Sequence, residues 1–326
     1  METLGIGIVG AGNIGSRHAR FWARVPGVSV VAVADTHNGA AENLAGAYPG
    51  AMAYADATEL IADPQVQVVH VCVPTHLHRN IAIASADAGK HVLCEKPMAL
   101  TLADCDAITD AAMRANVRLS VGHVTRFFPE YALAKRHVDA GAVGVPAIAR
   151  TRRAGAFPKT AWFADMEQSG GVIADLIVHD LDWLQWCFGP VARVFARVAK
   201  SPGFEYALLT LRHSSGVISH AEGVWGEPTG FHTAFEIAGN GGLLTHDSRA
   251  SRTLVAGTRS GTDSVVSVMN APLAPTDDPY FKQVQAFADA VRGKTPVAIA
   301  PTEARAAVAV ALAALESART GNAVEI

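Results

Sequence analysis

Charged residues, aromatic residues and cysteines are all scarce in this chain of 326 residues. Only 17% of the residues are charged and 7% are aromatic, whereas half are hydrophobic. Such a composition excludes a disordered chain and is typical of proteins with well-buried strands. The formal net charge of −3 leaves no basic excess with which to bind nucleic acid or an anionic membrane surface, so we expect neither partner.

The four cysteines of the chain are Cys72, Cys94, Cys105 and Cys187. They show no C-x-x-C spacing, and we interpret them as small buried hydrophobic residues in a reducing compartment, which predicts a cytoplasmic protein. His76 and His78 lie too close in sequence to suggest a metal site, and we expect none. The apolar run from Ala306 to Leu315 is shorter than the roughly 20 residues that a membrane-spanning helix needs.

Short β-branched segments alternate with helical patterns in the first part of the chain. This alternation predicts an α/β fold with a doubly wound parallel sheet covered by helices. The expected strands are Leu4 to Val9, Val28 to Ala34, Val66 to Val73, His91 to Cys94 and Arg118 to Gly122. The expected helices are Ile14 to Val25, His78 to Ala88 and a third that ends at Ala115 after a capping box formed by Thr101 and Asp104.

The pattern changes after about residue 125, where several strand-like segments follow one another. Successive strands predict an open, mostly antiparallel sheet in a second α/β domain. We therefore expect two domains, residues 1–124 and 125–326, with late helices able to pack back on the first. The expected strands are Ala147 to Ala154, Val191 to Val198, Tyr206 to Arg212, Val217 to Trp225 and Thr233 to Ala238. The expected helices are Pro129 to Ala140, Val172 to Phe188, Tyr280 to Arg292 and Thr302 to Arg319.

A glycine-rich motif lies between the first expected strand and the first expected helix. It reads G-x-G-x-x-G and consists of Gly10, Ala11, Gly12, Asn13, Ile14 and Gly15. Gly10 permits a tight turn, Gly12 lets a diphosphate approach the backbone, and Gly15 lets the helix pack on the strand. The helix N-terminus then faces the phosphate charge. The motif predicts a dinucleotide site in the first domain.

The second expected strand leads into Asp35, which follows Gly15 by the interval expected of the acid that binds the adenine ribose. Its negative charge would repel a 2′-phosphate, and the following residues, Thr36, His37 and Asn38, include no arginine to neutralise one. The sequence therefore favours NAD over NADP. The alternative role for Asp35 is the N-terminal cap of the next helix, which would leave the upstream glycine spacing unexplained.

A lysine follows the expected strand His91 to Cys94, within the tripeptide Glu95-Lys96-Pro97. This position places Lys96 at the carboxyl edge of a parallel sheet, where such sheets bind ligands. Farther along, Asp175 and His179 are spaced to lie on one face of a helix. Oxidation of a secondary alcohol requires a base for the hydroxyl proton, and a neutral imidazole has a suitable proton affinity near pH 7.

We therefore predict His179 as the base. Asp175 would hold a substrate hydroxyl or tune the imidazole, and Lys96 would hydrogen-bond the reacting oxygen or share the proton transfer. Taken singly, each residue also has an ordinary structural role as an alternative. Lys96 would be a solvated lysine, Asp175 a carboxylate on a helix surface, and His179 a core or capping histidine. Their joint pattern favours function. Asp180 and Asp182 match no trusted motif position, and we expect solvated or capping roles for them.

Taken together, these motifs resemble the Gfo/Idh/MocA family of sugar and cyclitol oxidoreductases over nearly the whole chain. The residues that carry the resemblance are the glycine motif, Pro74-Thr75, Glu95-Lys96-Pro97, Val121-Gly122, Arg126-Phe127, and Ser169-Gly170-Gly171 ahead of Asp175 and His179. The resemblance implies a Rossmann NAD-binding domain and a substrate-binding α/β domain. It also implies NAD(P)-linked hydride transfer at a secondary alcohol or its ketone.

Further site residues follow from the same resemblance. Pro74, Thr75, His78 and Glu95 correspond to positions near the cofactor, although packing or helix capping accounts equally well for His78. Substrate contacts are expected from His123, Arg126 and Trp162, with a buried structural role as the alternative for Trp162. Many relatives carry asparagine at Val124 and arginine at Thr125, so this chain departs from the usual pattern there.

The sequence thus predicts an NAD-dependent oxidoreductase that acts on a sugar, cyclitol or related polyol. The alternatives are a non-catalytic NAD sensor or regulatory protein and an NAD-assisted glycoside hydrolase. The resemblance also implies a homodimer or homotetramer that pairs through the sheet of the second domain. Residues expected on that flat face are Val217, Ser219, Ala221 and Gly223.

Overall fold

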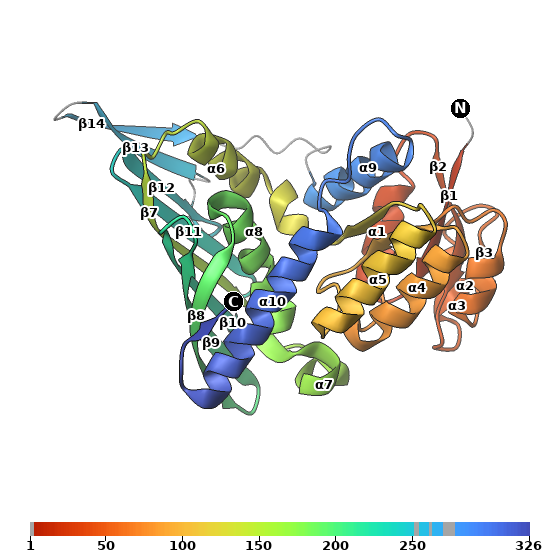
Figure 1. Ribbon diagram of the computed structural model, residues 1–326. Coiled ribbons are helices and arrows are strands. Elements are labelled where there is room, and N and C mark those ends of the chain that lie inside the picture. Colours follow the sequence, from red (N-terminus) through yellow and green to blue (C-terminus); the bar gives the residue numbers. More distant parts are fainter. Residues whose placement is uncertain (1–2, 251–253, 261–262, 270–277) are drawn as a thin grey trace. The chain divides into compact units, whose positions relative to one another are not determined.

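The computed structural model describes residues 3–250, 254–260, 263–269 and 278–326, and it divides into two compact units. The first unit comprises Met1–Val124 and Pro275–Arg305, and the second comprises Thr125–Ala274 and Ala306–Ile326. Each unit is built on its own sheet (Figure 1). No helix formed by the described residues has the length and apolar character required to cross a membrane.

The first unit contains a six-stranded sheet in the order β3-β2-β1-β4-β5-β6. All pairings are parallel, which confirms the predicted doubly wound fold. The strands are β1 (Leu4–Val9), β2 (Val28–Ala34), β3 (Met52–Tyr54), β4 (Val68–Val71), β5 (His91–Cys94) and β6 (Leu119–Val121). The helices between them are α1 (Asn13–Trp22), α2 (Ala40–Ala45), α3 (Ala57–Ala62), α4 (His78–Asp87) and α5 (Leu102–Arg114). The strand order reverses between β1 and β4, and sheets of this kind bind their ligands at the carboxyl ends of the strands at such a point.

A helix from late in the chain completes the core of the first unit. Helix α9 (Pro279–Val291) packs against α1 (Figure 1). Its Phe281, Val284 and Phe287 are buried in the same apolar cluster as Trp22 of α1. The guanidinium of Arg292, just after α9, donates to the backbone oxygens of Pro26 and Gly27 at 2.8 and 2.7 Å.

The second unit contains a nine-stranded sheet in the order β14-β13-β12-β11-β7-β10-β9-β8-β15. Among the strands that the structure describes, only β7 and β10 pair in parallel, so the sheet is mostly antiparallel, as predicted. Its first strands are β7 (Pro146–Gly155), β8 (Val191–Ser201), β9 (Phe204–His213), β10 (Ile218–Trp225) and β11 (His232–Gly239). The others are β12 (Gly242–Asp247), β13 (Leu254–Ser260), β14 (Asp263–Met269) and β15 (Val324–Glu325). Its helices are α6 (Pro129–Asp139), α7 (Met166–Ser169), α8 (Val178–Phe188) and α10 (Pro301–Thr320), the last of which begins in the first unit.

The exposed face predicted for β10 was wrong. Val217, Ser219 and Ala221 are buried, and a Cβ at Gly223 would lie 2.3 Å from Ile177, so these residues face the helical side of the sheet. Side chains alternate across a strand, and the open face therefore carries the other set, Ile218, His220 and Glu222. The predicted periodicity was correct, but it was assigned to the wrong face.

The predicted helix over Val172 to Phe188 is in fact two segments. Val172–Ile177 forms a π-helical turn, and the α-helix α8 begins at Val178. Gly170 and Gly171 precede the turn with φ of 72° and 66°, a conformation that favours glycine. Single π turns often occur at functional sites, and this one contains Asp175.

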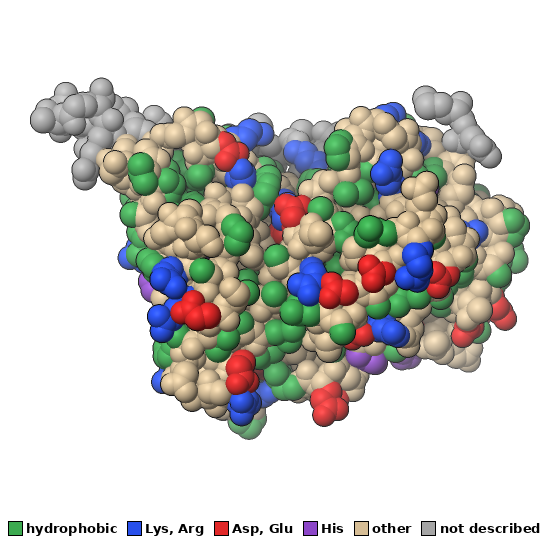
Figure 2. Space-filling model, in the orientation of Figure 1, with side chains coloured by type: hydrophobic (Ala, Val, Ile, Leu, Met, Phe, Trp, Pro, Cys, Tyr) green, Lys and Arg blue, Asp and Glu red, His purple; other side chains and the backbone are tan. Residues whose placement is uncertain are grey.

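On the face shown in Figure 2, acidic and basic side chains are interspersed within each unit and are not gathered by sign. This distribution agrees with the near-neutral net charge of −3.

Candidate active site

The three motif glycines in the first unit have three different surroundings. Gly10 has φ of 100°, and a Cβ there would lie 2.5 Å from the backbone oxygen of Cys72. A Cβ at Gly15 would lie 1.8 Å from the backbone oxygen of Gly10. A Cβ at Gly12, in contrast, would meet nothing within 4 Å. Gly10 and Gly15 are therefore required by packing, whereas Gly12 borders open space.

That open space lies at the N-terminus of α1. Gly12 is the N-cap residue of this helix, and no described side chain caps it. The first turn, which includes Asn13 and Ile14, contains no acidic residue. Free backbone N–H groups and the positive end of the helix dipole suit the diphosphate of a dinucleotide. The described residues at this turn therefore fit NAD.

Asp35 at the end of β2 is tied to the same turn. Its Oδ2 accepts a hydrogen bond from the backbone nitrogen of Ala11 at 2.7 Å, and its Oδ1 accepts one from the nitrogen of His37 at 2.8 Å. Burial alone would raise the pKa of Asp35, but the hydrogen bonds from His37 and Ala11 outweigh it and lower the pKa. Helix α2 is capped by Gly39, so the alternative role of Asp35 as a helix cap is wrong.

Glu95 lies in a buried polar cluster behind the turn. Its Oε1 accepts a hydrogen bond from Nε2 of His18 on α1 at 2.7 Å, and Nε2 of His70 on β4 lies 3.7 Å from the same oxygen. Its Oε2 accepts the backbone N–H of Lys96 at 3.3 Å. Burial would raise the pKa of Glu95, yet the two histidines hold it well below the usual range. The carboxylate is thus a buried anion that supports the Lys96 backbone.

His18, His70 and Glu95 also have the chemistry of metal ligands, and one ligand atom of each lies within 4.8 Å of the others. Trp22 argues against that role. Its indole nitrogen, which can only donate, lies 3.0 Å from Nδ1 of His70. In a neutral imidazole the proton is then on Nε2, the nitrogen that faces Glu95, and a protonated nitrogen cannot bind a metal. The pKa of His70 is lowered to about 4, first by burial and then by His18, so the neutral ring is favoured.

Lys96 follows Glu95 directly and is partly exposed, and its peptide bond to Pro97 is cis. His78 joins the loops on either side of this region. Its Nδ1 lies 2.9 Å from the oxygen of Pro97, and its Nε2 lies 2.9 Å from the oxygen of Val73, just before Pro74 and the buried Thr75. Burial lowers the pKa of His78 despite these two carbonyls. His78 therefore holds these two loops together through their backbone oxygens.

Asp175 and His179 lie in the second unit, on the π turn and the first turn of α8. Asp175 is buried and His179 is partly exposed. The turn is fixed at its start, because Glu205 accepts the N–H of Val172 at 3.2 Å and the hydroxyl of Ser169 accepts the N–H of Gly171 at 3.0 Å. A Cβ at Gly171 would lie 2.7 Å from Oε1 of Glu205, which explains the glycine.

The solvated or capping roles expected for Asp180 and Asp182 are wrong. Both are 1% exposed, and each pairs with an arginine. Arg153 donates from Nε to Asp180 at 2.6 Å and from its terminal nitrogen to Thr125 at 3.2 Å. Arg126 donates to both oxygens of Asp182, at 2.8 and 2.6 Å. Burial raises the pKa of Asp180 even though Arg153 opposes the rise. Sequence spacing gave no sign of these partners, since they come from distant segments.

The expected substrate residues have different surroundings. Arg126 is 7% exposed and its guanidinium is paired with Asp182, and His123 is fully buried in the first unit. Trp162 is partly exposed and stacks on Phe163, with ring centroids 3.8 Å apart. Of the three, Trp162 has the most accessible side chain, a partly exposed ring of the kind that can pack against a sugar face.

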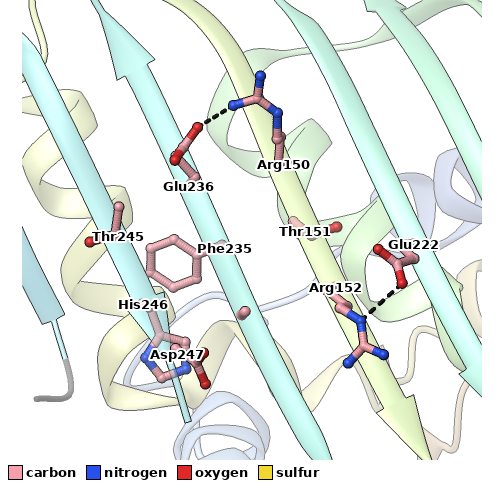
Figure 3. Close-up of a pocket in the computed structure, with 10 residues that line it drawn as sticks. Arg150, Thr151, Arg152, Glu222, Phe235, Glu236, Thr245, His246 and Asp247 are labelled. Carbon is pink, nitrogen blue, oxygen red and sulfur yellow. Dashed lines mark hydrogen bonds and ion pairs between the residues drawn. The ribbon is translucent and has the colours of Figure 1, made fainter. Parts of the chain in front are cut away.

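A hollow of about 300 Å³ lies on the open face of the second sheet (Figure 3). Arg150 and Arg152 of β7 project into it, where Arg150 pairs with Glu236 and Arg152 pairs with Glu222. Asp175 and His179 do not line this hollow. Because its arginines are already paired with carboxylates, we do not assign it to the reaction.

Comparison with known proteins identifies both parts of the chain. Residues 4–123 match the model of the oxidoreductase family with an NAD-binding Rossmann fold, and residues 131–245 match the Gfo/Idh/MocA C-terminal domain. Inositol 2-dehydrogenase 1 of Saccharopolyspora erythraea is 30% identical over 99% of this chain and 96% of that protein. Myo-inositol 2-dehydrogenase of Thermotoga maritima is 29% identical over 96% of this chain and 95% of that protein.

Among solved structures, GenD2 from gentamicin A biosynthesis, in complex with NAD, superposes with a TM-score of 0.88. It is 27% identical in sequence, and the alignment covers all of this chain and 97% of that one.

Proposed function

This chain belongs to the Gfo/Idh/MocA oxidoreductase family, and we propose that it is an NAD-dependent dehydrogenase of a sugar, cyclitol or related polyol. The observation that carries the proposal is the geometry of the glycine-rich turn before α1. There Gly12 borders open space at a helix N-terminus that has no side-chain cap, and the ionised Asp35 lies beside it. The relatives named inositol 2-dehydrogenases, which align over nearly the whole chain, support an inositol as the first substrate to test.

We assign the proton chemistry to Lys96, Asp175 and His179. Bound NAD would accept the hydride from the carbon that is oxidised. His179 takes the hydroxyl proton as the base, and the Lys96 ammonium hydrogen-bonds the same oxygen as negative charge develops on it. Asp175 accepts a hydrogen bond from a substrate hydroxyl or from the imidazole. The fixed π turn supports this assignment, because it holds Asp175 and the start of α8 in one defined geometry.

For the cofactor, NAD is favoured over NADP. The lowered pKa of Asp35 keeps its carboxylate ionised at neutral pH, so it can accept hydrogen bonds from ribose hydroxyls and repel a 2′-phosphate. Of the other predicted cofactor residues, Glu95 and His78 act through the backbone of the loops that they hold. Pro74 and Thr75 remain candidates for direct contact.

The experiment that tests this function is NADH formation, followed at 340 nm, with a panel of inositols, aldoses and polyols. We expect NAD-dependent turnover of at least one of them, which Lys96→Met and His179→Ala abolish while NAD still binds. Turnover that survives in both variants would refute the catalytic assignment. Release of aglycone from a chromogenic glycoside without net NADH would instead identify a hydrolase, and tight NAD binding without any turnover would identify a sensor.

We also infer that the protein pairs with a second copy through the open face of the second sheet. This face carries exposed Leu208 and Leu243 together with charged residues of both signs, such as Arg150 and Glu236. Mixed signs allow a symmetric copy to meet opposite charges. Light scattering should give a dimer or tetramer, and Leu208→Asp should shift it toward the 34.1 kDa monomer. A wild-type monomer would contradict this inference.

A further inference from the structure

A histidine lies beside the carboxylate of Asp35, which in the proposed function binds the adenine ribose. The Nδ1 of His37 is 3.1 Å from Oδ1 of Asp35, and the backbone nitrogen of His37 donates to the same oxygen at 2.8 Å. The imidazole is 89% exposed, whereas the Asp35 side chain is 13% exposed. The ring is thus fixed to Asp35 at one nitrogen and open to solvent elsewhere.

This contact defines where a proton would be added. Next to a carboxylate, Nδ1 carries the hydrogen in the neutral ring, so protonation adds a hydrogen at Nε2. Histidine is the side chain whose charge ordinarily changes between pH 5 and 8. With a neutral imidazole the Asp35–His37 pair carries a net charge of −1, and with an imidazolium it carries none.

That charge decides which dinucleotide the site accepts. A 2′-phosphate is carried on a hydroxyl that Asp35 would otherwise bind, so it must come close to whatever lies beside this carboxylate. A net charge of −1 repels the phosphate. A neutral pair with an imidazolium N–H beside it offers a hydrogen-bond donor to a phosphate oxygen.

On this basis we propose that His37 is a specificity-determining residue, which excludes NADP when neutral and admits it when protonated. The inference rests on the proposed NAD-binding function and deepens it. Among the described residues, Asp35, which directly follows β2, is the acidic group within 4 Å of the His37 ring nitrogens. The adjacent Thr36 and Asn38 are uncharged, so the loop itself provides no second cation.

The test is the affinity for NAD+ and NADP+, measured by calorimetry at pH 6.0 and 8.5, which requires no substrate. We compare the wild-type protein with His37→Ala, His37→Arg and the neighbouring control Asn38→Ala. The ratio of the NADP+ to the NAD+ dissociation constant removes effects that are common to both ligands. The 2′-phosphate itself titrates near pH 6, and His37→Ala retains that contribution.

In the wild type we expect this ratio to fall about tenfold more between pH 8.5 and 6.0 than it does in His37→Ala. Asn38→Ala should follow the wild type, and His37→Arg should bind NADP+ about tenfold more tightly than the wild type at pH 8.5. Equal pH dependence in wild type and His37→Ala would overturn the role of His37. Failure to bind either dinucleotide would overturn the proposed function itself.

Discussion

The Nε2 of His18 and the Oε1 of Glu95 lie 2.7 Å apart and join helix α1 to the end of strand β5 in the interior of the first unit. Helix α1 begins at the glycine-rich turn, and β5 leads directly into Lys96. The two segments that carry the cofactor turn and the candidate catalytic lysine are therefore linked through one buried carboxylate.

Replacement of that carboxylate should be costly even though the substitute has nearly the same shape. Glu95→Gln removes the negative charge and leaves His18 and His70 without their acceptor charge. We expect the free energy of unfolding to fall by about 3 kcal/mol in urea titrations. Glu59→Gln, on the exposed surface of α3, is the control and should change it by less than about 0.5 kcal/mol. A Glu95→Gln protein as stable as the control would contradict the interpretation that the negative charge of Glu95 stabilises this cluster.

His70 should make the protein sensitive to mild acid. Its pKa is about 4 in the folded chain, against an ordinary histidine pKa of 6.5, so between these values the unfolded chain binds a proton that the folded chain does not. Stability therefore falls as the pH falls from 6.5 to 4, by about 3 kcal/mol for this group alone. The pKa of Glu95 lies well below 4.5, so the stability that its ionised form contributes is also lost as the pH falls farther.

The measurement for His70 is a series of urea titrations from pH 7 to pH 4.5 on the wild type and His70→Asn. The amide oxygen of asparagine can still accept from Trp22, but the side chain does not titrate. We expect a shallower loss of stability in the variant. Identical slopes in both proteins would show that His70 is not the responsible group.

Gly12 and Gly15 provide a matched pair for separating binding from folding. A methyl at position 12 meets nothing within 4 Å, so Gly12→Ala should fold normally and bind NAD at least about tenfold more weakly, because the methyl occupies the space that the diphosphate needs. A methyl at position 15 would collide with the Gly10 carbonyl, so Gly15→Ala should lose about 2 kcal/mol of stability or more. Thermal unfolding and calorimetry of NAD binding distinguish the two effects. Normal NAD binding by Gly12→Ala would show that the diphosphate does not bind at this turn.

Arg153 should stabilise the fold mainly because it neutralises the buried charge of Asp180. Arg153→Met leaves Asp180 buried without its partner, and we expect a loss of about 3 to 5 kcal/mol at pH 7. The double variant Arg153→Met with Asp180→Leu removes both charges and should recover most of that stability. Urea titrations of the single and double variants check this. Additive losses in the double variant would mean that packing, and not charge pairing, is the source of the effect.

Much of the fold could be predicted from local sequence. The glycine motif fixed the position of α1, and Thr101 is the N-cap of α5, as its spacing to Asp104 predicts. In the second sheet, the alternating β-branched residues predicted strands β7, β8, β9, β10 and β11, whereas β12, β13 and β14 were missed. Short strands such as β3 (Met52–Tyr54) and β15 (Val324–Glu325) were missed, because two or three residues carry no detectable periodicity and form strands only through their neighbours.

The partners of the candidate site residues could not be predicted in the same way. The pairs of Glu95 with His18 and of Asp180 with Arg153 join residues 77 and 27 positions apart, and no local pattern encodes such contacts. One signal was available for His70, a polar residue between valines in a strand that is buried throughout. A buried histidine in such a strand requires a polar partner, and Trp22 and Glu95 provide it.

The place of α9 in the first unit has a consequence for how the protein is made. A ribosome releases the N-terminal segment first, yet Phe281, Val284 and Phe287, which cover α1, are translated only near the end. Until then the nascent first unit carries an uncovered apolar surface around Trp22. An isolated fragment of residues 1–124 would keep that surface exposed and would therefore be prone to aggregation, so a stable excised nucleotide-binding unit needs α9 supplied by a fused linker.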